Sequence, residues 1–262
     1  MGNLAVTLGK GVLSFAKSGE KVVASKPISK SLLKLSKPEK LTSLKTREYS
    51  DVISDMTAQR SGMVNTVDPE ISVEQMLARW KDNYMSANRE IRQKLMSDMG
   101  DENAYYFESV INKELPKIDK LISQSCLPRA VTLYRGASPY DFGLADLPSK
   151  DFIQKFYKKG KVFEIPVYPE VSLDKSIGEK FASNRILFKY NCPEGLNAVY
   201  MENLGGLSSV AKDINEQEVL LPRNLIAKFK SHTQKDGKDI IEIDILNKRP
   251  LFKKVHKFWE EV

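Results

Sequence analysis

The sequence predicts an α+β fold, because a helical pattern dominates the first half of the chain and a strand pattern dominates the second. Between Ser72 and Gly100, apolar residues recur every three or four positions, which is the spacing of one face of a helix. From Val131 onward the apolar residues follow a period of two, which is typical of strands. With 262 residues, 41% of them hydrophobic, the chain can bury one sizeable core.

The beginning of the chain is strongly basic, whereas the rest is nearly neutral. Residues 1–47 hold ten Lys and Arg against two glutamates, and the remainder holds 31 basic against 32 acidic residues. Serine and glycine are frequent in this segment, and Pro27 and Pro38 would break a long helix. We therefore assign residues 1–50 to a flexible targeting or secretion segment, residues 51–127 to a helical N-terminal region and residues 128–262 to the core.

Leucines within the basic segment leave two interpretations open. They stand among lysines, so the segment could form an amphipathic helix that contacts an anionic membrane surface; the alternative is a solvated tail. The leucines concerned are Leu32, Leu33, Leu35, Leu41 and Leu44. No apolar run approaches the roughly 20 residues of a membrane-spanning helix, so we expect a soluble protein.

Cysteine and histidine are scarce. Cys126, Cys192, His232 and His256 are too few and too scattered for a disulfide framework or a tetrahedral zinc site. We therefore expect no metal and a reducing compartment.

The helical region should hold two amphipathic stretches. Ser72 and Gln75 form a capping box at the start of the first, which continues through Leu95. The second runs from Phe107 to Ile122, with an interruption at Pro116.

The strand region begins with a feature suited to phosphate binding. The strand from Val131 ends in Tyr134-Arg135-Gly136, where a guanidinium and a bare backbone could meet a phosphorylated ligand. After the strand around Val171, Asp174 or Ser176 should cap a short helix that presents Phe181. Further strands are predicted at Val162–Phe163, Ile186–Tyr190, Asn197–Met201, Glu218–Leu221, Leu225–Lys230 and Ile240–Leu246, the last two joined across Asp236-Gly237.

Two glutamates stand two residues apart before an apolar run. Because side chains alternate along a strand, Glu216 and Glu218 should point to the same face. Taken alone, the stretch from Asn215 to Pro222 could also be a solvated edge with ordinary surface glutamates.

Taken in order, three elements resemble the Arg, Ser-Thr-Ser and Glu-x-Glu motifs of mono-ADP-ribosyltransferases of the arginine-modifying branch. They are Tyr134-Arg135-Gly136, the strand that ends at Ser172 with Phe181 following, and Glu216 to Pro222. The likeness covers residues 128–248 and is nearest to enzymes of T4-like bacteriophages and to injected bacterial toxins or effectors. It implies a split β-sandwich of two perpendicular sheets, with NAD bound as a substrate in the cleft between them.

The resemblance also implies roles for single residues. Glu218 would stabilise the oxocarbenium-like ribose, and Glu216 would orient the incoming guanidinium and accept its proton. Arg135, with Tyr134 beside it, would hold the pyrophosphate or adjoining ribose, and the Gly136 backbone would bind the nicotinamide amide.

Two further residues complete the implied site. Phe181 would stack on the nicotinamide, and Ser172 would brace the site. Each residue has a simpler alternative: Arg135 as a salt-bridged strand end, Phe181 as a core residue and Ser172 as a turn residue before the helix.

At one position the sequence departs from the family, because Glu170 stands where the first serine of Ser-Thr-Ser is expected. A carboxylate beside Glu218 would raise one of the two pKa values, unless Glu170 turns away or a basic group lies between them.

The implied function is transfer of ADP-ribose from NAD to arginine side chains of a host protein, in the cytoplasm of a cell into which the chain is delivered. Residues 205–215 would form the loop that contacts this target, and no nucleic acid is implied. Two alternatives remain: an NAD glycohydrolase, which uses water as acceptor, and a non-catalytic binding or virion protein that keeps the fold.

The basic segment contains no predicted catalytic element. Deleting residues 1–47 should therefore leave the turnover of NAD with a soluble acceptor nearly unchanged, as measured by nicotinamide release. A large loss of activity would show that the predicted domain boundary is misplaced.

Overall fold

The chain forms two units, Met1–Lys40 and Leu41–Val262, which are described separately. The computed structural model describes residues 7–8, 11–12, 46–66, 68–78, 88, 115–137, 151, 153–154, 160–182, 186–202, 204, 215–246 and 255–256. In the first unit, strand β1 (Thr7–Leu8) pairs with β2 (Gly11–Val12) in antiparallel fashion. The leucines of the predicted amphipathic helix lie outside the described residues.

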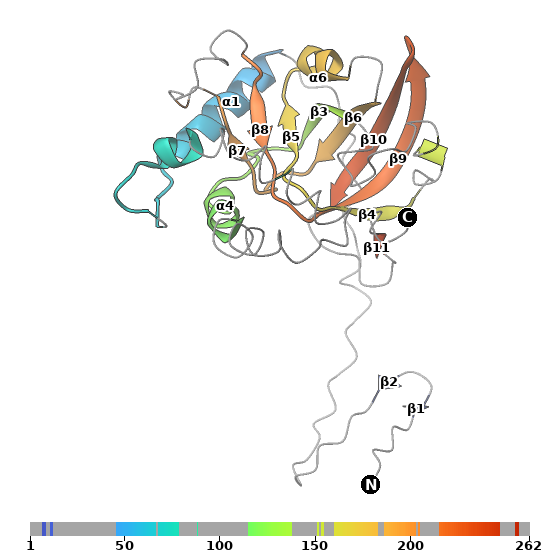
Figure 1. Ribbon diagram of the computed structural model, residues 1–262, viewed down its shortest axis with the longest axis horizontal. Helices are drawn as coiled ribbons and strands as arrows, with labels where there is room; N and C mark the ends of the chain where they lie inside the picture. Colours follow the sequence, from blue (N-terminus) through green and yellow to red (C-terminus); the bar gives the residue numbers. More distant parts are fainter. Residues whose placement is uncertain are drawn as a thin grey trace, which may run out of the picture. The chain divides into compact units, whose positions relative to one another are not determined.

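The second unit is built on a mixed sheet (Figure 1). Among the described residues this sheet has nine strands in the order β11-β4-β9-β10-β6-β3-β5-β8-β7. Neighbours are antiparallel except for the pairs β10/β6 and β11/β4. The strands are β3 (Val131–Ala137), β4 (Val162–Ile165), β5 (Glu170–Ser172), β6 (Ile186–Cys192), β7 (Val199–Tyr200), β8 (Glu218–Leu220), β9 (Leu225–Lys235), β10 (Lys238–Leu246) and β11 (Val255–His256).

The sheet divides into two groups of strands between β3 and β5. Strand β3 is joined to β6 along its whole length, from Val131 opposite Cys192 to Ala137 opposite Ile186. It is joined to β5 only where Tyr134 lies opposite Ser172. The predicted α+β class is confirmed. Where the resemblance implies two sheets, the described residues form one, whose two strand groups are joined by the pairing of Tyr134 with Ser172.

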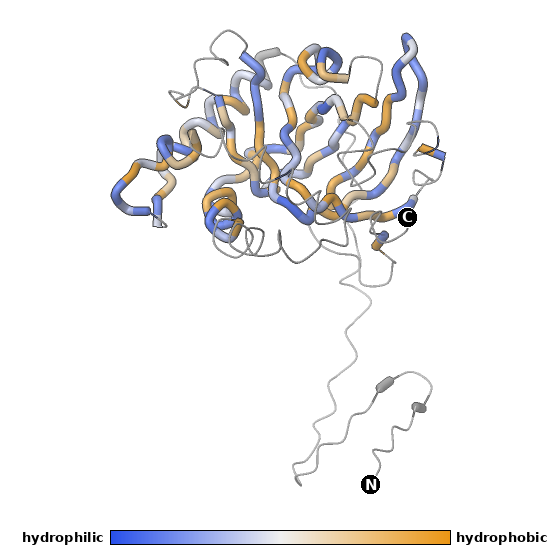
Figure 2. Tube along the Cα trace, in the orientation of Figure 1, coloured by the Kyte–Doolittle hydropathy of each residue, from blue (hydrophilic) through white to orange (hydrophobic). Residues whose placement is uncertain are grey.

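Local sequence explains the longest strands. Residues of β3 alternate between buried and half-buried, and Figure 2 shows hydrophobic residues recurring along the strands. Asp236 and Gly237 have φ values of 52° and 74°, as a two-residue hairpin turn with left-handed backbone requires. This confirms the predicted connection between β9 and β10.

Helix α1 (Thr46–Ser61) contacts β7. It begins inside the stretch that the sequence analysis assigned to the basic segment. Val52, Met56 and Arg60 are buried at successive spacings of four residues, so they share the inner face of the helix.

The capping box before the predicted long helix is confirmed. The Ser72 amide donates to Gln75 Oε1 (2.8 Å), and the Gln75 amide donates to Ser72 Oγ (3.1 Å). Residues 73–78 are helical, and of the rest of this predicted helix only Asn88 is described, also as helix.

Helix α4 runs from Leu115 to Ile122, so the predicted interruption of the helix at Pro116 is wrong. Pro116 stands in its first turn, where the missing amide proton costs no helical hydrogen bond. Residues 107–114 lie outside the described part of the chain. No described helix is both long enough and apolar enough to cross a bilayer.

A buried tyrosine ties α4 to the sheet. The Tyr168 hydroxyl, on a fully buried side chain, donates to Asp119 Oδ1 (2.7 Å). Asp119 also receives hydrogen bonds from Arg223, just after β8, the shortest at 2.8 Å. Burial, reinforced by the Asp119 carboxylate, raises the pKa of Tyr168 well above its ordinary value.

The Tyr168 hydroxyl can be removed without leaving a charge unpaired, because Asp119 keeps its bonds to Arg223. Tyr168→Phe should therefore lower the free energy of unfolding by about 1–2 kcal/mol, measured by urea denaturation. A loss below about 0.3 kcal/mol would show that the bond to Asp119 does not hold α4 in place.

Candidate active site

Three of the predicted site residues lie opposite one another on neighbouring strands. Tyr134 on β3 is the register partner of Ser172 on β5, and Ser172 is the register partner of Glu218 on β8. Residues separated by 38 and 46 positions in sequence are therefore joined by adjacent backbone pairing. This row is the geometric centre of the candidate site.

Ser172 connects the strands to the segment before Glu218. Its buried hydroxyl donates to the main-chain carbonyl of Glu216 (2.6 Å) and accepts from the Asp174 amide (2.9 Å). A further bond from the Leu173 amide to the carbonyl of Gln217 (3.1 Å) fixes the same segment. Ser172 is thus both a turn residue before the helix and a brace for the glutamate segment.

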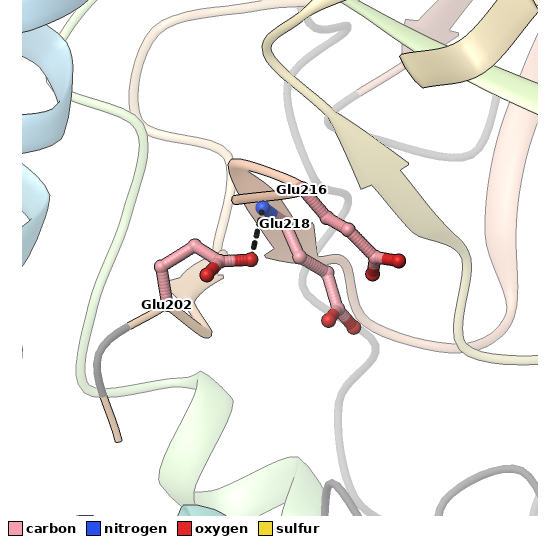
Figure 3. A group of neighbouring side chains, drawn as sticks. All are labelled: Glu202, Glu216 and Glu218. Carbon is pink, nitrogen blue, oxygen red and sulfur yellow. Dashed lines mark hydrogen bonds between the residues drawn. The ribbon is translucent and has the colours of Figure 1, made fainter. Parts of the chain in front are cut away.

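The glutamate pair comes together by a different route from the one predicted. Strand β8 begins only at Glu218, and Gln217 has a left-handed φ of 46°, so strand alternation does not place Glu216. A turn places it instead, in which the Gln217 amide donates to Asn215 Oδ1 (3.2 Å). Figure 3 shows the side chains of Glu216 and Glu218 extending in the same direction from this turn.

A third carboxylate, Glu202, joins the pair. One carboxylate oxygen from each of Glu202, Glu216 and Glu218 lies within 4.8 Å of the other two. Glu202 Oε1 also accepts a hydrogen bond from the Glu218 amide (3.3 Å), drawn in Figure 3. Within the described part of the chain, this group has the oxygen ligands to hold a cation, whether a metal ion or a guanidinium.

Glu202 is held in place by a buried arginine of α1. Arg60 is 5% exposed, and its Nη1 donates to the main-chain carbonyls of Tyr200 and Glu202, the latter at 2.7 Å. Its guanidinium also lies 5.9 Å from the centre of the Tyr200 ring. Burial lowers the pKa of Arg60, and the nearby acidic groups oppose this shift.

Arg135 lies near Glu170, the residue that the resemblance aligns with the first serine of Ser-Thr-Ser. Arg135 Nη2 is 4.0 Å from Glu170 Oε2, and Arg135 is 9% exposed. The other oxygen, Glu170 Oε1, accepts a hydrogen bond from Asn88 Nδ2 (2.6 Å). Glu170 is therefore held by the Arg135 guanidinium and the Asn88 amide. A basic group does lie beside Glu170, which is one of the two conditions under which it would not disturb Glu218.

The glycine after Arg135 makes room for helix α6 (Lys175–Phe181). A Cβ atom on Gly136 would lie 2.2 Å from the Ala182 amide nitrogen and 2.3 Å from the Phe181 carbonyl carbon. Asp174 caps this helix by accepting from the Ser176 amide (2.8 Å). Phe181 is 55% exposed, so the alternative that it is a core residue is wrong.

A sequence comparison identifies the family. The model of the ADP-ribosyltransferase exoenzyme family matches residues 76–249, which is more than half of the chain. The chain belongs to this family. Among curated proteins, no sequence gives a match.

Solved structures of ADP-ribosyltransferases share the fold. The C3 exoenzyme of Clostridium limosum has a TM-score of 0.57 at 20% identity, covering 79% of this chain and 97% of that one. Plx2a, a toxin of Paenibacillus larvae, has a TM-score of 0.54 at 18% identity, covering 76% and 94%. The ADP-ribosyltransferase Vis, solved in complex with agmatine, has a TM-score of 0.54 at 13% identity, covering 82% and 91%.

Family membership confirms the predicted activity class and the predicted substrate, NAD. In this ADP-ribosyltransferase exoenzyme, Tyr134, Arg135, Ser172, Glu216 and Glu218 fall on three adjacent strands and the turn before β8. Gly136 and Phe181 come together at the C-terminal end of α6. The predicted target-contact loop lies almost entirely outside the described residues.

The sequence analysis missed three residues that support the site, because none of them belongs to a recognisable motif. They are Arg60, Asn88 and Glu202. For Glu202 there was a signal: it directly follows the predicted strand Asn197–Met201. The Met201 amide bonds to the Glu218 carbonyl (2.9 Å), so pairing these two predicted strands would have placed Glu202 beside Glu218.

The close approach of α6 to Gly136 can be tested with a matched pair of substitutions. Gly136→Ala should lower the free energy of unfolding by about 2–3 kcal/mol or more, because backbone atoms at 2.2 Å must move. Gly62→Ala is the control, since its Cβ would meet nothing nearer than 3.5 Å. Equal stability of the two variants, measured by chemical denaturation, would contradict this account of Gly136.

Proposed function

We propose that this ADP-ribosyltransferase transfers ADP-ribose from NAD to the arginine side chains of a host protein. The observation that carries the proposal is the grouping of the Glu216 and Glu218 carboxylates beside the row formed by Tyr134, Ser172 and Glu218. One carboxylate is needed to stabilise the ribosyl cation and a second to handle the guanidinium. The turn at Gln217 brings both to the same place.

In the proposed reaction, the bond between the ribose C1′ and the nicotinamide nitrogen breaks, and nicotinamide leaves as a neutral molecule. Glu218, which is 4% exposed, stabilises the positive charge that develops on the ribose. A guanidinium nitrogen then forms the new bond to C1′ and gives its proton to Glu216. Arg135 binds the pyrophosphate, while the exposed ring of Phe181 is available to stack on the nicotinamide.

The choice of arginine as acceptor rests on charge. A free guanidinium stays protonated and is a poor nucleophile, so it needs an anion that orients it and accepts its proton. Glu216 is half-buried, and its carboxylate stands with those of Glu202 and Glu218, so three carboxylates lie around the position that we assign to the acceptor. Water as acceptor, the glycohydrolase alternative, would need no such group.

We further propose that the chain acts in the cytoplasm of a host cell. The exoenzyme character of the family supports delivery from a bacterium rather than expression by a phage. Contact of the basic N-terminal segment with a membrane surface remains a prediction from sequence, since its leucines are outside the described residues.

Two substitutions should separate the roles of the glutamates. Glu216→Gln should reduce transfer to agmatine by about 100-fold or more, the usual loss when a general base is removed, while hydrolysis of NAD continues. Glu218→Gln should reduce both reactions by a similar or larger factor, because ribosyl-cation formation is common to them. Both rates are measured as nicotinamide release, with and without agmatine.

The control is Glu194→Gln, which alters an exposed glutamate in the turn between β6 and β7. Its two rates should match those of the unaltered protein. Near-normal transfer to agmatine by Glu216→Gln would contradict arginine specificity. Nicotinamide release that never depends on an acceptor would favour the glycohydrolase.

A further inference from the structure

Glu170 supplies a counter-ion for an almost fully buried arginine. Its Oε2 lies 4.0 Å from Arg135 Nη2, and the Arg135 side chain is 9% exposed. The Glu170 side chain, at 25% exposure, remains partly accessible to solvent. Moving a cation out of water is costly unless an anion is close by, so this carboxylate stabilises Arg135 in the protein without nucleotide.

The position of the Glu170 carboxylate is fixed by a second residue. Asn88 Nδ2 donates to Glu170 Oε1 (2.6 Å) and to the main-chain carbonyl of Tyr168 (2.9 Å). Asn88 Oδ1 accepts from the Tyr168 amide (3.0 Å). Asn88 is fully buried, and these three hydrogen bonds all join its side chain to residues 168–170, so a buried amide holds the carboxylate on one side.

This arrangement extends into the network that anchors α4. The Tyr168 hydroxyl bonds to Asp119, and Asp119 bonds to Arg223. A continuous set of contacts therefore runs from Arg223 through Asp119, Tyr168 and Asn88 to Glu170. If the Glu170 carboxylate moved away when a ligand approached Arg135, it would lose its hydrogen bond to Asn88.

We propose that Glu170 is a positioning residue that holds the Arg135 guanidinium in the nucleotide-free protein and weakens the binding of NAD. The proposal rests on the proposed function, in which Arg135 binds the pyrophosphate of NAD. The pyrophosphate must share the guanidinium with a carboxylate that Asn88 keeps in place, and the two anions repel each other. Glu170 thus stabilises the protein without nucleotide and lowers its affinity for NAD.

Glu170→Gln isolates the charge, because it preserves the shape and keeps an oxygen that accepts from Asn88. ADP-ribose carries the same pyrophosphate as NAD, and we expect its Kd to fall about three- to tenfold. This is the gain expected when the repulsion between a carboxylate and a pyrophosphate at roughly 7 Å in a partly hydrated site is removed. The KM for NAD should fall with it, while kcat should change little. Without nucleotide, the Tm of the variant should be lower by about 2–4 °C.

Two further variants keep the test independent of one substitution. Glu170→Ser introduces the serine that the resemblance aligns with this position and should also bind ADP-ribose more tightly than the unaltered protein. Glu164→Gln removes a half-buried carboxylate on β4, in the other group of strands, and should change neither the Kd nor the Tm.

The outcomes separate the two proposals. If the unaltered protein transfers ADP-ribose but Glu170→Gln binds ADP-ribose with equal or lower affinity, Glu170 does not oppose the nucleotide and this inference is overturned. If neither protein binds ADP-ribose or releases nicotinamide, the proposed function fails, and the inference fails with it. Tighter binding together with a lower Tm supports the inference, since a purely structural residue would change only the Tm.

Discussion

A single backbone pairing, between Tyr134 and Ser172, joins the two groups of strands, and the site is arranged around it. Strand β5 has only three residues, yet it connects β3 to β8 and carries both Glu170 and Ser172. The ion pair between Glu170 on β5 and Arg135 on β3 adds a side-chain contact across this junction. Ser172 does not cross it, but its hydroxyl fixes the glutamate turn within the group of β5 and β8.

Charge is distributed unevenly on the two sides of this junction. On one side, Glu202, Glu216 and Glu218 gather three carboxylates, two of them on buried residues. On the other side, Arg135 and Glu170 form an opposed pair. NAD presents a cationic nicotinamide ring and an anionic pyrophosphate, so the carboxylate cluster suits the ring, whereas the pyrophosphate has to share Arg135 with Glu170. The arginine acceptor adds a second cation at the anionic end.

Much of this arrangement could be predicted from the sequence, because it depends on local patterns. Period-two runs located the main strands, Asp236-Gly237 located the hairpin, and the Ser72–Gln75 spacing located a helix start. The glutamate pair was also found, although the reason given for its geometry was wrong: a left-handed residue at Gln217, which no alternation rule anticipates, brings the carboxylates together.

The contacts that could not be predicted join residues far apart in sequence. Arg60 reaches carbonyls about 140 positions away, and Asn88 reaches Glu170 across 82 positions. Arg60 is one of many polar residues in α1, and Asn88 is a single polar residue within the apolar pattern predicted between Ser72 and Gly100. Their role depends on which strand the helix covers, and periodicity within one segment carries no information about that.

The central claim is that arginine receives the ADP-ribose, and the chemical identity of the modified residue tests it most directly. Host-cell lysate would be incubated with the protein and isotopically labelled NAD, and the modified peptides would be mapped by tandem mass spectrometry. The account predicts that the label is on arginine side chains and that Glu218→Gln eliminates it. Label found instead on asparagine, threonine or cysteine, with arginine unmodified, would contradict it.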